Sequence, residues 1–93
     1  MTKHEILDLA KAATADRGLN YGRPEQNFER IAARWRVHIQ NRFGVEVAID
    51  GVSVALMLAD LKIARLENSP NHIDSFVDLA GYAACAGEVA TGA

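Results

Sequence analysis

The stretch HIDSFVDLAGYAACAG, residues 72–87, decides the fold of this chain. Apolar and small residues fill it, which predicts a packed helix from about His72 to Val89. Two carboxylates interrupt the apolar run, and because Asp74 and Asp78 are four residues apart they lie on one side of that helix. Like charges at this spacing repel, and burial increases the repulsion unless a cation lies nearby. The stretch therefore predicts a helix packed against neighbours that supply positive charge.

Three further helices are predicted before this stretch. Thr2 and Glu5 fit a capping box that begins a helix ending near Gly18. The glycines, Asn and Pro of GLNYGRP, residues 18–24, favour a loop. The other expected elements are helices over 24–43 and 51–67, joined by an extended linker over 45–50. We therefore expect an all-α fold, an antiparallel bundle of about four helices in one domain, residues 1–93, with a frayed tail over about 90–93.

Apolar periodicity predicts which side of each helix is packed. In the second helix the stripe is formed by Phe28, Ile31, Ala32, Trp35 and Ile39. The third helix is expected to pack mainly through Val54, Met57, Leu58, Leu61 and Ala64, and the fourth through Phe76, Val77, Ala80, Ala83, Ala84 and Gly87.

Composition restricts the classes of function. With 93 residues, 49% of them hydrophobic, the chain is a folded domain, and its small size and apolar content favour a homo-oligomer. The net charge of -2 argues against general binding of nucleic-acid backbones. No apolar run reaches the length of a membrane span and the start does not resemble a secretory signal, so we expect a cytoplasmic protein with no membrane partner. The single cysteine, Cys85, is expected to be a small buried hydrophobe.

Two pairs of acids are candidate metal ligands. Lys62 and Arg65 share a face of the third helix, so the short connection to the fourth helix can bring them to Asp74 and Asp78. Two interpretations stay open: the acids form structural ion pairs and favour the helix dipole, or they bind Mg²⁺ through oxygen. A second pair of acids on the second helix could join them in a site for one or two Mg²⁺ ions, or could be ordinary first-turn acids; the candidate metal ligands are then Glu25, Glu29, Asp74 and Asp78.

The loop between the first two helices carries groups that suit a nucleotide. Arginine and tyrosine stack on bases, and arginine and asparagine bind phosphate and polar edges. Tyr82 lies on the same side of the fourth helix as Asp78 and can reach the same pocket. A ring packed on the core explains Tyr21 equally well. The candidate nucleotide-binding residues are Arg17, Tyr21, Asn27, Lys62, Arg65 and Tyr82.

Two resemblances rest on these residues. The segments DRGLNYGRPEQNFERIAARW, LADLKIARL and HIDSFVDLAGYAACAGE resemble a family of small uncharacterised phage and prophage proteins over nearly the whole chain. More distantly, the helix with Asp74 and Asp78 resembles the second metal-binding helix of MazG-like all-α nucleoside triphosphate pyrophosphohydrolases. That resemblance implies an oligomeric Mg²⁺ enzyme, although here both acid pairs, Glu25–Glu29 and Asp74–Asp78, are spaced by three intervening residues, and the enzymes have two.

The leading hypothesis is a MazG-like nucleotide pyrophosphohydrolase or a degenerate nucleotide binder. In the enzyme, Glu29, Asp74 and Asp78 would hold Mg²⁺ for the attack of water on the α-phosphorus. The first alternative is a non-enzymatic phage protein that inhibits a host factor or captures a nucleotide signal. The second alternative is a small assembly module without a ligand.

Overall fold

The computed structural model describes the backbone of residues 1–92 and their side chains apart from those of residues 19–21. Over this range the chain forms four α-helices and no strand. The helices are α1 (Lys3–Tyr21), α2 (Pro24–Phe43), α3 (Gly51–Asn68) and α4 (Ile73–Thr91). The prediction of an all-α chain of four helices is confirmed.

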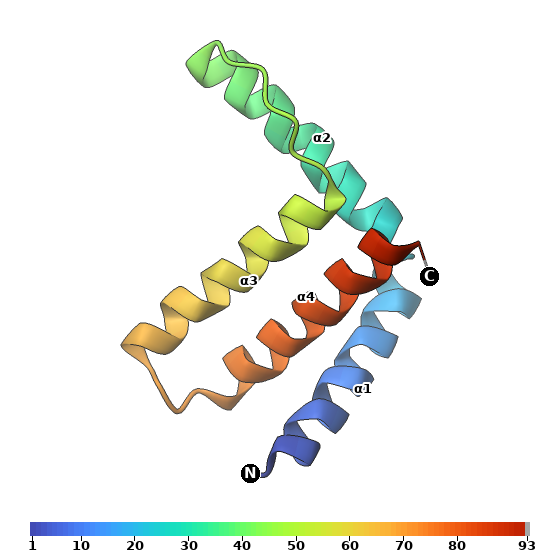
Figure 1. Ribbon diagram of the computed structural model, residues 1–93, viewed down its shortest axis with the longest axis vertical. Helices are drawn as coiled ribbons and strands as arrows, with labels where there is room; N and C mark the ends of the chain where they lie inside the picture. The colour runs from blue at the N-terminus through green and yellow to red at the C-terminus, as the bar shows by residue number, and fades with distance from the viewer. Residues whose placement is uncertain (93) are drawn as a thin grey trace.

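Three of the helices lie side by side, with α4 in the middle (Figure 1). The short connection over residues 69–72 makes α3 and α4 antiparallel neighbours, as expected, whereas α1 runs in the same direction as α4. The helices α1 and α4 approach closely at Gly81, where an added Cβ would meet the Thr14 methyl group at 3.4 Å. The fourth helix therefore packs against both α1 and α3.

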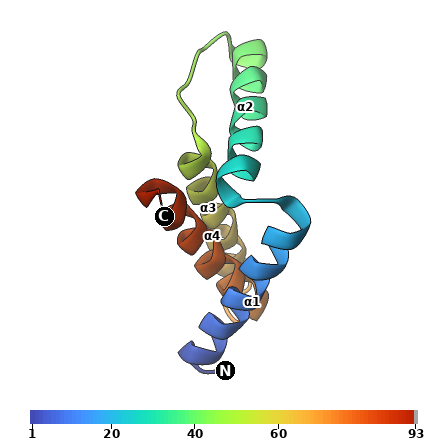
Figure 2. The same cartoon turned by 90° about the vertical axis from the view of Figure 1, so that its right-hand side faces the viewer.

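The second helix leaves this layer (Figures 1 and 2). Its first half packs on α3, where a Cβ at Gly51 would meet the Phe28 Cβ at only 3.3 Å. Its second half extends away from the other helices and is accompanied only by the extended residues 45–50. A core of mostly small residues forms where α2, α3 and α4 meet; it consists of Phe28, Ala32, Val54, Ala55, Cys85 and Ala86.

Local chemistry explains the helix ends. Thr2 accepts a hydrogen bond from the Glu5 amide, as the capping box predicts, and Asp50 caps α3 by accepting one from the Ser53 amide at 2.8 Å. That bond holds the pKa of Asp50 below its usual value. The prediction that the first helix ends near Gly18 is wrong. Gly18 stays helical and Gly22, with φ of 84°, ends α1, so the loop shortens to two residues.

The predicted packed faces of α3 and α4 are partly wrong. On α3 the small residues Ala55 and Ala59 are buried beside Val54, and Met57 and Leu61 are exposed. On α4 the buried residues are Ser75, Val77, Gly81, Cys85 and Ala86, whereas Phe76, Ala83, Ala84 and Gly87 are exposed. Apolar residues surround both helices, so periodicity could not choose among their sides. The fourth helix also continues to Thr91, two residues beyond its predicted end at Val89.

Candidate functional site

One carboxylate lies between two cations at the junction of α1, α3 and α4. The Lys62 ammonium lies 3.0 Å from Asp78 Oδ2, and the Arg17 guanidinium donates to Asp78 Oδ1 at 3.2 Å. The Lys62 side chain is only 12% exposed and that of Asp78 is 23% exposed, so the group is largely shielded from water. Together the two cations, Arg17 and Lys62, and the Asp78 carboxylate carry one net positive charge. The expected link between Lys62 and Asp78 is therefore present, and Arg17 joins it from α1.

The same arginine covers an aromatic ring. The Arg17 Cζ atom lies 4.8 Å from the centroid of Tyr82, within the range of a cation–π interaction. Tyr82 in turn contacts Phe28 of α2, with ring centroids 6.4 Å apart. Arg17 thus contacts both Asp78 and Tyr82, and Tyr82 connects the group to the core through Phe28.

A cavity of about 490 Å³ opens beside this group. Polar side chains of α1, α2 and α4 face it together with apolar side chains of the core. Its lining consists of Thr14, Arg17, Gly18, Gly22, Pro24, Asn27, Phe28, Ile31, Leu58, Tyr82 and Cys85. Asn27 makes no side-chain hydrogen bond to any described residue, so its amide is available to a ligand. The volume lies within the range of small-molecule sites, which is about 300–1,000 Å³.

The structure brings together five of the predicted nucleotide-binding and acidic residues: Arg17, Asn27, Tyr82, Lys62 and Asp78. Two others lie elsewhere. Asp74 is exposed in the first turn of α4, and Arg65 is exposed at a separate hollow near the α3–α4 connection. The side chain of Tyr21 lies outside the described residues, although its backbone ends α1 beside the cavity.

The four candidate metal ligands do not gather. Glu25 pairs with Arg23 at 2.6 Å, and Glu29 pairs with Arg36 at 3.2 Å. Within the part of the chain that the structure describes, no three His, Cys, Asp or Glu side chains form a group that could hold a metal ion. Among the described residues of one chain the four candidate acids therefore do not form a common site, and binding of Mg²⁺ stays a prediction.

Cys85 is a lining residue that sequence reasoning assigned only to packing. It follows Asp78 by seven residues and Tyr82 by three, so the helical repeat places all three on one side of α4. Burial raises the pKa of the thiol, the charge of Glu88 adds to the increase, and Arg17 opposes it. The thiol is therefore a poor nucleophile at neutral pH.

A labelling experiment tests this environment. Because only the thiolate reacts, and because Cys85 is buried with a raised pKa, a maleimide should modify the native protein at least roughly tenfold more slowly than the urea-unfolded chain at pH 7. Raising the pH above 8 should increase the native rate. Equal rates for native and unfolded protein would show that Cys85 is open to solvent.

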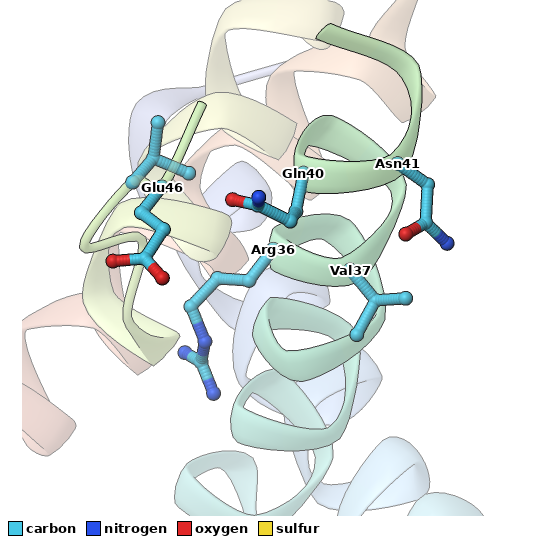
Figure 3. Close-up of a pocket in the computed structure, with 6 residues that line it drawn as sticks. Arg36, Val37, Gln40, Asn41 and Glu46 are labelled. Carbon is cyan, nitrogen blue, oxygen red and sulfur yellow. The ribbon is translucent and has the colours of Figure 1, made fainter. Parts of the chain in front are cut away.

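A second hollow, of about 350 Å³, lies between α2 and the linker (Figure 3). Arg36 extends there from α2, donating to the Ile49 carbonyl at 2.5 Å and to Glu29 Oε1 at 3.2 Å. The bond to Ile49 holds the linker against α2, and the bond to Glu29 engages a second nitrogen of the arginine within its own helix. Gln40 points to the same side as Glu46. The contacts of Arg36 at this hollow position the linker, and the hollow does not bring the predicted site residues together.

Comparisons with known proteins agree with the sequence resemblance. Residues 5–90 match the family described as Domain of unknown function (DUF6378). The chain belongs to this DUF6378 family. Its relatives include the Gene 55 protein of Mycobacterium phage D29, 35% identical over 85 residues, and the Gene 55 protein of Mycobacterium phage L5, 42% identical over 82 residues.

These alignments cover 91% and 88% of this chain but 52% and 46% of the two phage proteins. This DUF6378 chain thus spans about half the length of the curated relatives it matches. No solved structure matches it significantly. Among the described residues, no helix is long and apolar enough to cross a membrane. The resemblance to a phage protein family is confirmed, and the resemblance to MazG-like enzymes stays a prediction.

Proposed function

We propose that this phage-family domain binds a nucleotide in the cavity beside Arg17 and Tyr82, in the cytoplasm of the infected bacterium, without hydrolysing it. The observation that carries the proposal is the shared position of Arg17, which contacts both the Tyr82 ring and Asp78 at the cavity wall. A nucleotide combines a planar base with an anionic phosphate, and these are the two chemical groups that such a wall can receive.

The charge balance supports an anionic ligand. Asp78 neutralises only one of the two cations that contact it, Arg17 and Lys62. Arginine can bind a phosphate through two donors while its flat face stays on a ring. Partial shielding from water strengthens such a contact, because the effective dielectric is lower than in bulk solvent. A phosphate would thus compete with Asp78 for the Arg17 donors.

The opposite side of the cavity suits the base. Phe28, Ile31 and Leu58 provide apolar surface, and the Asn27 amide, which bonds to no described side chain, can donate and accept. A mostly apolar lining with few polar groups is typical of ligand sites. Binding without hydrolysis is favoured over a Mg²⁺ enzyme because the four candidate acids are dispersed or already paired.

Thermal shift and calorimetric titration with nucleoside mono-, di- and triphosphates, in EDTA and at moderate salt, test the proposal. At least one nucleotide should raise Tm and release heat, whereas ribose alone should not. Arg17→Gln should weaken binding at least about tenfold, since a hydrogen bond to a charged group contributes about 1.5–3 kcal/mol. Asn27→Leu, which keeps the side-chain volume, should weaken it less.

Arg34→Gln is the matched control, because Arg34 is an exposed arginine on α2 that does not line the cavity. It should bind as tightly as the wild type. Absence of binding for every nucleotide at 1 mM, or equal binding by Arg17→Gln and the wild type, would refute the proposal and favour a host-protein inhibitor or an assembly module. Mg²⁺-dependent release of pyrophosphate would instead restore the enzyme hypothesis.

A further inference from the structure

The outward side of α4 carries no charge along its whole length. Helical periodicity places on this side the residues Phe76, Ala80, Ala83, Gly87 and Ala90, which follow one another at intervals of three or four. Phe76 is 38% exposed, and Ala83, Gly87 and Ala90 are also exposed. The charged residues of α4, Asp74, Asp78 and Glu88, lie on other sides. A helix whose solvent side is apolar is typical of a buried element.

The neighbouring helix extends this surface. Asp78 and Lys62 bridge one side of the α3–α4 pair, and the cavity opens on that side. Because successive helical residues are rotated by about 100°, Ile63 points away from the side that its neighbour Lys62 occupies. Leu56, two turns before Ile63, lies on the same side of α3. This is the side of the α3–α4 pair on which Phe76 and Ala83 lie. Leu56 is 52% and Ile63 is 44% exposed. We call the surface formed by Leu56, Ile63, Phe76, Ala80, Ala83 and Gly87 the outer α3–α4 face. No helix lies in front of α4 between α3 and α1 (Figure 1).

The chain also exposes more surface than a compact monomer of its size. A folded monomer of 10.1 kDa exposes about 5,300 Å², whereas this chain exposes 6428 Å². Its radius of gyration is 14.4 Å, against about 12 Å for a compact domain of this length. The excess of about 1,100 Å² includes the second half of α2, which extends away from the other helices, and it exceeds the ~800 Å² that each partner buries in a standard interface.

We propose that the outer α3–α4 face is the interface of a symmetric dimer, in which α4 of one chain packs against α4 of a second copy. Small residues allow two helix backbones to approach closely, and the α4 part of this face is apolar and free of charge, so it is complementary to itself. The exposed acids Asp60 and Glu67 share the Leu56–Ile63 side of α3, so an α4–α4 contact would leave them at the rim of the interface. A membrane surface is disfavoured as the partner, because α4 contains no Lys or Arg to attract anionic lipid. The proposal does not depend on nucleotide binding, since the cavity lies on the other side of the α3–α4 pair.

Gly87→Glu is the informative substitution. A Cβ at Gly87 meets nothing within 4 Å in the monomer, and replacing a glycine inside a helix favours the helix. The change should therefore preserve or raise helicity while placing a charge in the interface. Ala83→Glu, one turn earlier, should act in the same way. Ala33→Glu is the matched control, because Ala33 is an exposed alanine on α2.

Sedimentation equilibrium of the full chain from 10 to 200 μM tests the proposal. The wild type and Ala33→Glu should show the mass of two chains, and Gly87→Glu and Ala83→Glu the mass of one chain with unchanged helical circular dichroism. A wild type that stays a single chain at 200 μM would overturn the proposal. Two-chain mass in both Gly87→Glu and Ala83→Glu would also overturn it, because the interface would then lie elsewhere.

Discussion

Phe28→Ala is expected to lower the free energy of unfolding by about 3–5 kcal/mol. Phe28 is 5% exposed and is the largest side chain of a core otherwise made of Ala, Val and Cys. Its truncation leaves a cavity between α2, α3 and α4 that small neighbours cannot fill. A domain of this length has a stability of about 5–14 kcal/mol, so the loss is a large fraction of the total.

Urea denaturation followed by circular dichroism measures this change, and Phe43→Ala is the control. Phe43 lies on the same helix but is 64% exposed near its end, so its truncation should change the unfolding free energy by less than about 0.5 kcal/mol. Equal losses for the two variants would contradict the packing described for α2.

Asp78→Asn is expected to lower the unfolding free energy by about 2 kcal/mol, or Tm by roughly 8–15 °C. The amide leaves Arg17 and Lys62 without their shared carboxylate, and Lys62 is too shielded to be solvated fully. The loss falls below the 3–5 kcal/mol of a fully buried pair because both cations keep some contact with water.

Asp74→Asn is the matched control for this second change, since it alters another aspartate on the same helix. Asp74 is exposed and makes no ion pair with a described residue, so only its interaction with the helix dipole is lost, about 0.3–1 kcal/mol. Differential scanning calorimetry of both variants gives the comparison. A larger fall in Tm for Asp74→Asn than for Asp78→Asn would contradict the ion-pair cluster.

Capping residues and apolar periodicity predicted where the helices lie in the sequence, but not how the helices pack on one another. Capping groups at Thr2 and Asp50 and the stripe around Phe28 were enough to locate the helices, because these signals lie within a few residues. The packed side of α4 could not be chosen, since apolar residues surround the helix. Gly18 and Gly22 are both adequate stops for α1, and the sequence signal alone did not distinguish between them.

The candidate site was predicted only in part, because the sequence indicates contacts between adjacent helices better than contacts between distant ones. The Lys62–Asp78 pair followed from a short connection between adjacent helices. Arg17 was expected near a ligand, but its contact with Asp78 spans 61 residues and depends on how α1 packs on α4. Glu29 turned out to pair with Arg36, two turns along its own helix. That ion pair engages Glu29 on its own helix, and among the described residues Glu29 does not join Asp78 in a common acidic group.

The central place of α4 has a consequence for folding during synthesis. The first helix finds most of its packing on α4, more than fifty residues further along the chain, while α3 and α4 are sequence neighbours. Nearby contacts close sooner than distant ones, so the α3–α4 hairpin is the natural nucleus on which α1 docks last. Until the ribosome has released residue 73 and those that follow, the side of α1 that packs on α4 has no native partner and stays exposed to non-native contacts.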